Sequence, residues 1–148
     1  MLGEQARVAV IGLGVSGLSS LRYLAASEHQ LFAFDHLASP RCLAEIQSTL
    51  PQVNIFLGDY PEDLLITMDC LVISPGVDRR HPVLARVIAA GVLVSSDVDL
   101  FCRVSAAPIV AVTGSNGKTT VTHLLAEVFQ AAGKTVHIGG NVGVPVLD

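Results

Sequence analysis

One stretch near the start of the chain, residues 8–35, most narrows the folds that this sequence can adopt. The apolar run VAVI (residues 8–11) predicts a buried strand, and GLGVSG (residues 12–17) follows it at once with the pattern G-x-G-x-x-G. Leucines then recur at helical spacing, and a second apolar run (residues 31–34) ends at Asp35. A strand, glycine-rich turn, helix, second strand and acid in this order are typical of a nucleotide-binding unit built on a parallel sheet.

Each glycine of the GLGVSG loop has an expected role. Gly12 makes the tight turn, Gly14 lets a phosphate approach the backbone, and Gly17 lets the helix pack against the strand. Asp35 lies about 20 residues after the loop, where dinucleotide-binding proteins carry a carboxylate that contacts a ribose. Any one of these elements also occurs as a plain turn or a helix cap. Their order in this chain favours nucleotide binding.

Strands continue to alternate with helices up to residue 94. The patterns predict strands at residues 53–56, 69–73 and 92–94, helices at 40–50 and 81–90, and a loop with a short helix at 58–69. This alternation predicts an α/β fold with a parallel sheet and right-handed crossovers, so we expect a Rossmann-like domain over residues 1–95. Ser74, Pro75 and Gly76 end one strand, either as a plain turn or as the wall of a ligand cleft.

A second phosphate-binding motif, TGSNGKTT, occupies residues 113–120. It follows an apolar run (residues 108–112) that predicts a strand, and it precedes a stretch with helical spacing (residues 121–132). In such a turn the backbone N–H groups and the helix N-terminus attract phosphate oxygens, Lys118 can reach the terminal phosphates, and Thr119 can hold Mg²⁺. The usual pattern, G-x-x-x-x-G-K-[ST], has glycine where this chain has valine, so the loop is a shorter form.

Residues 96–148 read as the beginning of a second domain. Residues 95–107 form a connector, and a further strand is expected at residues 135–138. A phosphate-loop domain needs more than one βαβ unit, a second acid for Mg²⁺ and a site for the acceptor substrate. The sequence after residue 138 has no room for them. We therefore expect a Rossmann-like parallel-sheet domain followed by the truncated start of a P-loop ATPase domain.

Composition excludes several other classes of protein. Hydrophobic residues make up 51% of the 148 residues and charged residues 15%, which argues against disorder. The net charge of -4 argues against a general nucleic-acid or membrane-surface binder. No apolar run approaches a membrane span, the start lacks a signal peptide, and neither the cysteines nor the histidines show metal-binding spacing. We expect a cytoplasmic protein with no nucleic-acid or membrane partner.

The motifs taken together resemble a known family. GLGVSG, SPG, DVDLFCR, TGSNGKTT and GGNVGVP are similar to segments of the muramyl ligases of peptidoglycan synthesis. TGSNGKTT is specific for these enzymes and the folylpolyglutamate synthases, while GLGVSG and residues 97–103 narrow the resemblance to the branch that adds D-glutamate. The resemblance covers nearly all of this chain but only the N-terminal part of such an enzyme. In that family the first domain is Rossmann-like, yet it binds the uridine diphosphate end of the substrate and not NAD.

The resemblance implies roles for particular residues. The UDP-substrate would be bound by Gly14, Val15, Ser16, Asp35, His36, Ser74, Pro75, Gly76 and Asn141. ATP would be bound by Gly114, Ser115, Asn116, Gly117, Lys118, Thr119 and Thr120. Lys118 would be the catalytic residue that holds the β- and γ-phosphates, and Thr119 would be a ligand of Mg²⁺. Asp35 and His36 would hold the uracil edge, although the family often has a small hydroxyl residue where this chain has His36.

The reaction implied by the resemblance is an ATP-dependent ligation. ATP activates the carboxylate of UDP-N-acetylmuramoyl-L-alanine as an acyl phosphate, the amine of D-glutamate attacks it, and ADP and phosphate leave. The further Mg²⁺ ligands and the D-glutamate-binding domain of that family lie beyond residue 148. We therefore expect this chain alone to be inactive and the full-length enzyme to be a monomer.

Two other hypotheses start from the same residues. GLGVSG and Asp35 suggest an NAD-dependent dehydrogenase domain, and the two glycine-rich loops alone suggest a non-catalytic nucleotide-binding module. TGSNGKTT has no place in a dehydrogenase and favours the ligase.

Overall fold

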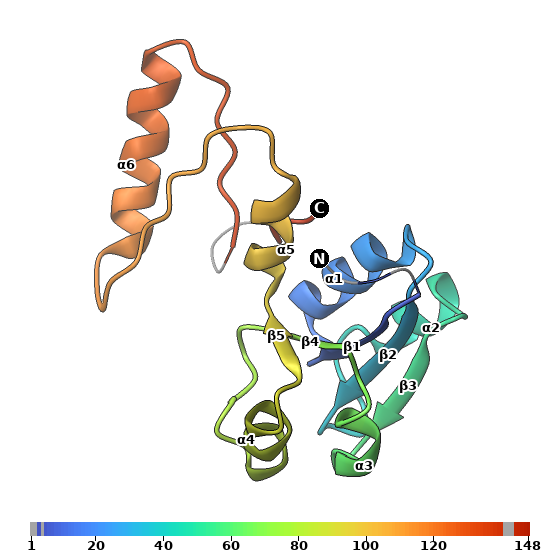
Figure 1. The fold of residues 1–148 in the computed structure, drawn as a ribbon. Helices are drawn as coiled ribbons and strands as arrows, with labels where there is room; N and C mark the ends of the chain where they lie inside the picture. The colour runs from blue at the N-terminus through green and yellow to red at the C-terminus, as the bar shows by residue number, and fades with distance from the viewer. Residues whose placement is uncertain (1–2, 4, 141–143) are drawn as a thin grey trace.

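A computed structural model describes Gly3, residues 5–140 and residues 144–148. Its centre is a five-stranded parallel sheet in the order β3-β2-β1-β4-β5 (Figure 1). The strands are β1 (Arg7–Ile11), β2 (Gln30–Asp35), β3 (Asn54–Leu57), β4 (Cys70–Ile73) and β5 (Leu93–Ser95). The helices are α1 (Val15–Ala25), α2 (Leu43–Thr49), α3 (Glu62–Leu65), α4 (Pro82–Ala89), α5 (Asp97–Val104) and α6 (Lys118–Ala131). The predicted α/β fold class is confirmed.

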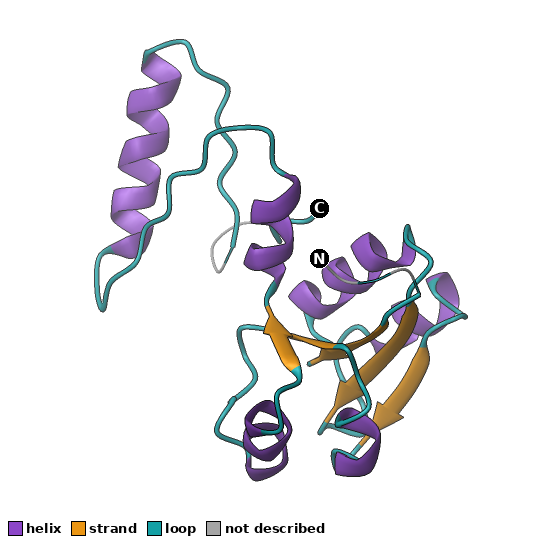
Figure 2. Cartoon of the chain, viewed as in Figure 1, coloured by secondary structure: helices purple, strands orange, loops and turns teal. Residues whose placement is uncertain are grey.

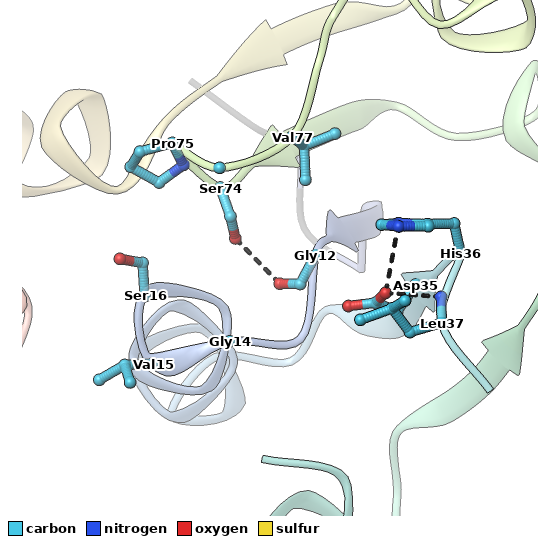
Figure 3. A pocket seen from close by; sticks show the side chains of 11 residues that line it. Gly12, Gly14, Val15, Ser16, Asp35, His36, Leu37, Ser74, Pro75 and Val77 are labelled. Atoms are coloured by element: carbon cyan, nitrogen blue, oxygen red, sulfur yellow. Dashed lines mark hydrogen bonds and ion pairs between the residues drawn. The ribbon is translucent and has the colours of Figure 1, made fainter. Parts of the chain in front are cut away.

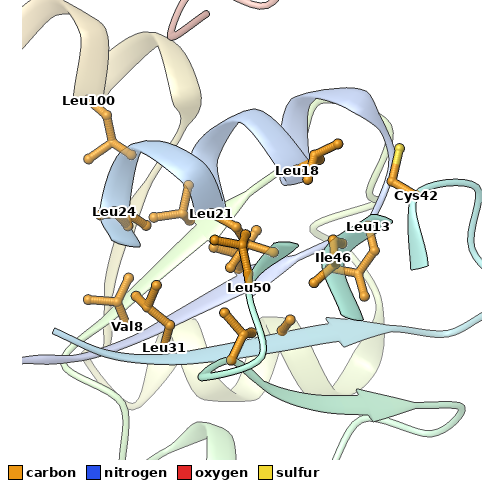
Figure 4. Close-up of a cluster of buried hydrophobic side chains, with 14 of the residues drawn as sticks. Val8, Leu13, Leu18, Leu21, Leu24, Leu31, Cys42, Ile46, Leu50 and Leu100 are labelled. Atoms are coloured by element: carbon orange, nitrogen blue, oxygen red, sulfur yellow. The ribbon is translucent and has the colours of Figure 1, made fainter. Parts of the chain in front are cut away.

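Two hydrophobic clusters cover the two faces of the sheet. In β1, Val8 and Val10 point into a first cluster, which also holds apolar side chains of α1, α2 and α5 (Figure 4). Ala9 and Ile11 point into a second cluster on the opposite face, with side chains of α3 and α4. Strands that are buried on both faces read as continuous apolar runs, and this is why the sequence predicts them so directly.

Several elements start or stop for local reasons. Pro82 opens α4, where a missing N–H costs no helical hydrogen bond. Ser96 caps α5: its hydroxyl accepts from the Asp99 N–H, and the Asp99 carboxylate accepts in return from the Ser96 N–H. α2 ends just before Leu50, whose successor Pro51 disfavours helical geometry in the residue before it. All the predicted strands and helices of residues 8–94 are present, and the observed ends of several strands differ from the predicted ends by one residue.

The part of the chain after α5 has little regular structure besides α6, which stands apart from the sheet between two loop segments (Figure 2). The predicted helix is present, but its apolar face is exposed at Leu124 and Val128. The prediction of strands at residues 108–112 and 135–138 is wrong, because neither segment is a strand in the structure. Among the described residues no other strand lies beside either segment, and a strand without a hydrogen-bonding neighbour does not persist.

Leu100 and Leu147 connect α5 and the C-terminal residues to the apolar cluster on the sheet. Leu100 of α5 is 5% exposed and belongs to the first cluster, where Figure 4 shows it with Leu24 of α1. Leu147 packs against the same cluster. The chain therefore leaves the sheet through α5 and returns to it after α6. None of the helices in the described ranges has both the length and the apolar character that crossing a bilayer requires.

Candidate nucleotide-binding site

A pocket of about 380 Å³ is formed by three turns, each of which follows a neighbouring strand of the sheet. They are the glycine loop after β1, the turn after β2 and the turn after β4 (Figure 3). The lining residues are Gly12, Gly14, Val15, Ser16, Asp35, His36, Leu37, Ser74, Pro75, Gly76 and Val77. Between β1 and β4 the strand order reverses, and open α/β sheets bind their ligands at such a point.

The pocket brings together almost all the residues that the sequence predicts for the UDP-substrate. The eight that line it are Gly14, Val15, Ser16, Asp35, His36, Ser74, Pro75 and Gly76. Asn141, the ninth, lies outside the described residues. Sequence reasoning gave Gly12 only the role of a tight turn, and it missed Leu37 and Val77 as lining residues. Leu37 and Val77 each directly follow a predicted lining residue, and that adjacency was the available signal.

The glycine loop is shaped by contacts that only glycine allows. Gly12 has φ +92°, and a Cβ there would lie 2.6 Å from the Cγ2 of Val77. A Cβ on Gly17 would lie 1.9 Å from the main-chain oxygen of Gly12, so only glycine lets α1 begin this close to the turn. Gly14 has no atom within 4 Å of the position of a Cβ. The backbone at Gly14 is therefore open to close approach by a ligand.

The carboxylate of Asp35 is buried beneath the loop, with the residue only 6% exposed. Its Oδ2 accepts a hydrogen bond from the Leu13 N–H at 2.7 Å, and its Oδ1 accepts one from the Leu37 N–H at 2.9 Å. The Nδ1 of His36 lies 3.5 Å from Oδ1, while the His36 side chain is 67% exposed at the pocket. Asp35 also acts on Tyr60, whose pKa is raised by burial and, to a lesser extent, by this negative charge.

The other side of the loop is held by Ser74, the first residue after β4. Its hydroxyl donates a hydrogen bond to the main-chain oxygen of Gly12 at 2.9 Å (Figure 3). Ser74 therefore joins the turn after β4 to the glycine loop, just as Asp35 joins the turn after β2 to it.

The N-terminus of α1 supplies the electrostatic character of the pocket. Gly14 is the N-cap, and no side chain caps this helix end. The first N–H groups of a helix have no partner within it, and together with the helix dipole they attract anions. Val15 and Ser16, the first two residues of α1, both line the pocket. The arrangement can bind a phosphate at one end and offer polar side chains to a sugar or base at the other.

The predicted ATP-binding residues lie in a separate, exposed turn and in the first residues of α6. Residues 114–120 are exposed, and none of them lines the pocket. Gly117 has φ +76° and is the N-cap of α6, and the ammonium group of Lys118 donates to the Gly114 oxygen. Across the described ranges no three or more His, Cys, Asp or Glu side chains gather as a metal site.

Comparison with known proteins identifies two family models along the chain. The Mur ligase MurD-like N-terminal domain matches residues 6–96, and the Mur ligase middle domain matches residues 112–145. A UDP-N-acetylmuramoylalanine–D-glutamate ligase of Marinobacter nauticus is 43% identical over 142 residues, which are 96% of this chain and 32% of the relative. The enzyme of the same name from Pseudomonas aeruginosa is 45% identical over 139 residues, 94% of this chain and 31% of the relative.

Solved structures show the same fold at lower identity. A pseudomurein peptide ligase type C from Methanothermus fervidus superposes with a TM-score of 0.57 at 22% identity, over 86% of this chain and 26% of that protein. UDP-N-acetylmuramate-alanine ligase from Thermotoga maritima superposes with a TM-score of 0.56 at 18% identity, over 88% of this chain and 30% of that protein. The chain spans about a third of the length of the relatives it matches in sequence. From the family model over residues 6–96, the chain belongs to the Mur ligase family, with a MurD-like N-terminal domain.

Proposed function

We propose that this chain is part of an ATP-dependent ligase of peptidoglycan synthesis, which adds D-glutamate to UDP-N-acetylmuramoyl-L-alanine through an acyl phosphate. The observation that carries the proposal is that one pocket is lined by all eight described residues that the family resemblance assigns to the UDP-substrate. The names of the relatives support the same reaction. Because those relatives are about three times longer, the complete reaction belongs to a longer enzyme, and the chain alone would be inactive.

The pocket would bind the uridine diphosphate end of the substrate. The diphosphate would lie at the N-terminus of α1, where the N–H groups of Val15 and Ser16 are available to its oxygens. The uracil would lie toward Asp35 and His36. Residues 74–76 would form the opposite wall, and Asn141 would contact the phosphate or the lactyl group.

ATP would be bound at the second glycine-rich turn, by residues 114–120. The fit rests on two features: α6 begins at this turn without a side-chain cap, and the ammonium of Lys118 already lies against the turn at the Gly114 oxygen. Lys118 would hold the β- and γ-phosphates, and the hydroxyl of Thr119 would be one ligand of Mg²⁺. When bound, Mg²⁺ neutralises charge on the phosphates.

Two nucleotide sites on one chain imply a division into two units. We propose a UDP-substrate domain over residues 1–95 and the beginning of an ATP-binding domain over residues 96–148. The two family models match residues 6–96 and 112–145, and these ranges support the proposed boundary. The proposal includes a monomeric full-length enzyme in the cytoplasm, where ATP is available.

A thermal-shift experiment tests the ligand of the pocket. UDP and UDP-N-acetylmuramoyl-L-alanine should stabilise the protein, and NADH should not. The variant Val15→Glu places a negative charge at the helix N-terminus, on a side chain that is already 43% exposed, and should abolish the shift. Val98→Glu is the matched control, because Val98 is 45% exposed at the start of α5, outside the pocket. Stabilisation by NADH without stabilisation by either UDP compound would overturn the proposal in favour of a dehydrogenase domain.

A further inference from the structure

We infer that Asp35 and Ser74 are positioning residues, which hold the glycine loop in the shape that offers the first N–H groups of α1 to a phosphate. The inference rests on the proposed function only in taking UDP as the ligand. It changes the role of Asp35, which the family resemblance gives as a contact to the uracil edge.

The hydrogen bonds of Asp35 are directed into the protein. Each oxygen of the carboxylate already accepts from a backbone N–H, that of Leu13 in the loop at 2.7 Å and that of Leu37 at 2.9 Å. Hydrogen bonds from N–H groups to an ionised carboxylate are among the strong ones. At 6% exposure the residue presents only a small surface to the pocket that it lines. Its main partner is therefore the loop itself.

Ser74 is committed in the same way. A serine hydroxyl has one proton to donate, and Ser74 donates it to the main-chain oxygen of Gly12 at 2.9 Å. The loop is thus fixed at two consecutive residues from two different strands: Gly12 is held from the end of β4, and Leu13 from the end of β2.

The loop needs such restraint because glycine is conformationally free. A glycine-rich turn that is not held samples many conformations, and ordering it when a ligand binds costs free energy. The loop leads directly into α1, so loosening it misplaces the N–H groups of Val15 and Ser16. Loosening the loop should therefore weaken binding of the phosphate part of the ligand, and the base and ribose should bind almost as before.

His36 provides a contrast within the same pocket. Its side chain is 67% exposed and makes no hydrogen bond to the glycine loop among the described residues. If the uracil or ribose touches this end of the pocket, His36→Ala should weaken every ligand that carries them by the same factor, with or without phosphate.

The test compares UDP with uridine, which lacks the phosphates. Binding of both is measured by NMR titration for the wild-type chain, Asp35→Ala, Asp35→Asn, Ser74→Ala and His36→Ala. Asp35→Ala and Ser74→Ala should each weaken UDP about tenfold while uridine changes less than about threefold. Asp35→Asn keeps the size of the side chain and one acceptor, so it should recover part of the loss. If the alanine variant does not fold, Asp35→Asn still allows the comparison of UDP with uridine.

A second readout needs no ligand. Hydrogen exchange at the Leu13 amide should be roughly ten- to a hundredfold faster in Asp35→Ala, and close to the wild-type rate in His36→Ala. Equal weakening of UDP and uridine by Asp35→Ala, with unchanged exchange at Leu13, would overturn the inference and make Asp35 a direct ligand contact. If the wild-type chain bound no UDP, the proposed function would fail, but the exchange at Leu13 would still decide whether Asp35 holds the loop.

Discussion

The ammonium group of Lys118 donates a hydrogen bond of 2.6 Å to the main-chain oxygen of Gly114, four residues earlier. This bond bridges the two ends of the second glycine-rich turn, just where α6 begins. Both residues are exposed, so a phosphate can reach the ammonium and replace the carbonyl oxygen as its partner. The turn therefore holds a positive charge in place before any nucleotide arrives.

Lys118→Ala should affect the proposed ATP site and leave the proposed UDP-substrate site unchanged. In the full-length enzyme we expect turnover to be lost and ATP affinity to fall about ten- to a hundredfold, because a charge-assisted contact is removed. UDP-substrate affinity should stay the same, since none of residues 113–120 lines the pocket beside Asp35. Isothermal calorimetry with each ligand measures both effects, and Lys134→Ala, beyond the end of α6, is the matched control. Equal losses of ATP and UDP-substrate affinity would contradict this division of labour.

Two glycine-to-alanine substitutions in one loop should have opposite consequences. Gly17→Ala places a Cβ 1.9 Å from the main-chain oxygen of Gly12, and we expect it to lower the free energy of unfolding by about 3 kcal/mol. Gly14→Ala meets nothing within 4 Å, so stability should change little, while UDP binding weakens because the methyl group faces the open side of the loop. Urea unfolding and UDP titration of both variants measure this. A stable Gly17→Ala protein would show that the loop can move away from α1.

Leu100 should be the main anchor of α5 on the sheet. It is 5% exposed within the first hydrophobic cluster, so Leu100→Ala should cost about 2–5 kcal/mol of unfolding free energy. Val104→Ala, on the same helix at 55% exposure, should stay within about 0.5 kcal/mol of the wild type. Similar losses in both variants, measured by urea denaturation, would mean that α5 is held by something other than this contact.

Stability should fall at alkaline pH through Tyr60. Burial, with a smaller effect from Asp35, raises the pKa of its phenol above 10.0, so the folded protein keeps the phenol neutral where the unfolded chain ionises it. The unfolded state then binds fewer protons than the folded state, and the free energy of unfolding decreases as the pH rises through about 10 and above. Tyr60→Phe should reduce this decrease, as measured by urea unfolding between about pH 9 and 11.

Cys70 adds a contribution of the same sign. Burial raises the pKa of its thiol above 9.0, so ionisation of the unfolded chain also favours unfolding above about pH 9. Cys70→Ala therefore has to be measured beside Tyr60→Phe to separate the two. A Tyr60→Phe protein whose stability decreases as steeply as that of the wild type would show that Tyr60 makes no contribution.

The sequence alone determined the architecture of residues 8–94. Strands that are buried on both faces have uninterrupted apolar sequences, and a turn that requires glycine, as at Gly12, fixes the position of glycine in the sequence. Both constraints act on neighbouring residues, so they can be recognised in the sequence. The same spacing, with the family resemblance, picked out eight lining residues of the pocket. Leu37 and Val77 were not predicted as lining residues, because nothing in their residue type indicates a ligand.

Only the tertiary structure decided what depends on neighbours distant in sequence. The apolar runs at residues 108–112 and 135–138 are not strands, because a strand exists through hydrogen bonds to another strand and none lies beside them in the described part of the chain. The direction of the Asp35 carboxylate, toward the Leu13 N–H, is likewise a matter of three-dimensional geometry. Residue type and spacing place a group at the edge of the sheet, but only the packed fold decides which atom it binds.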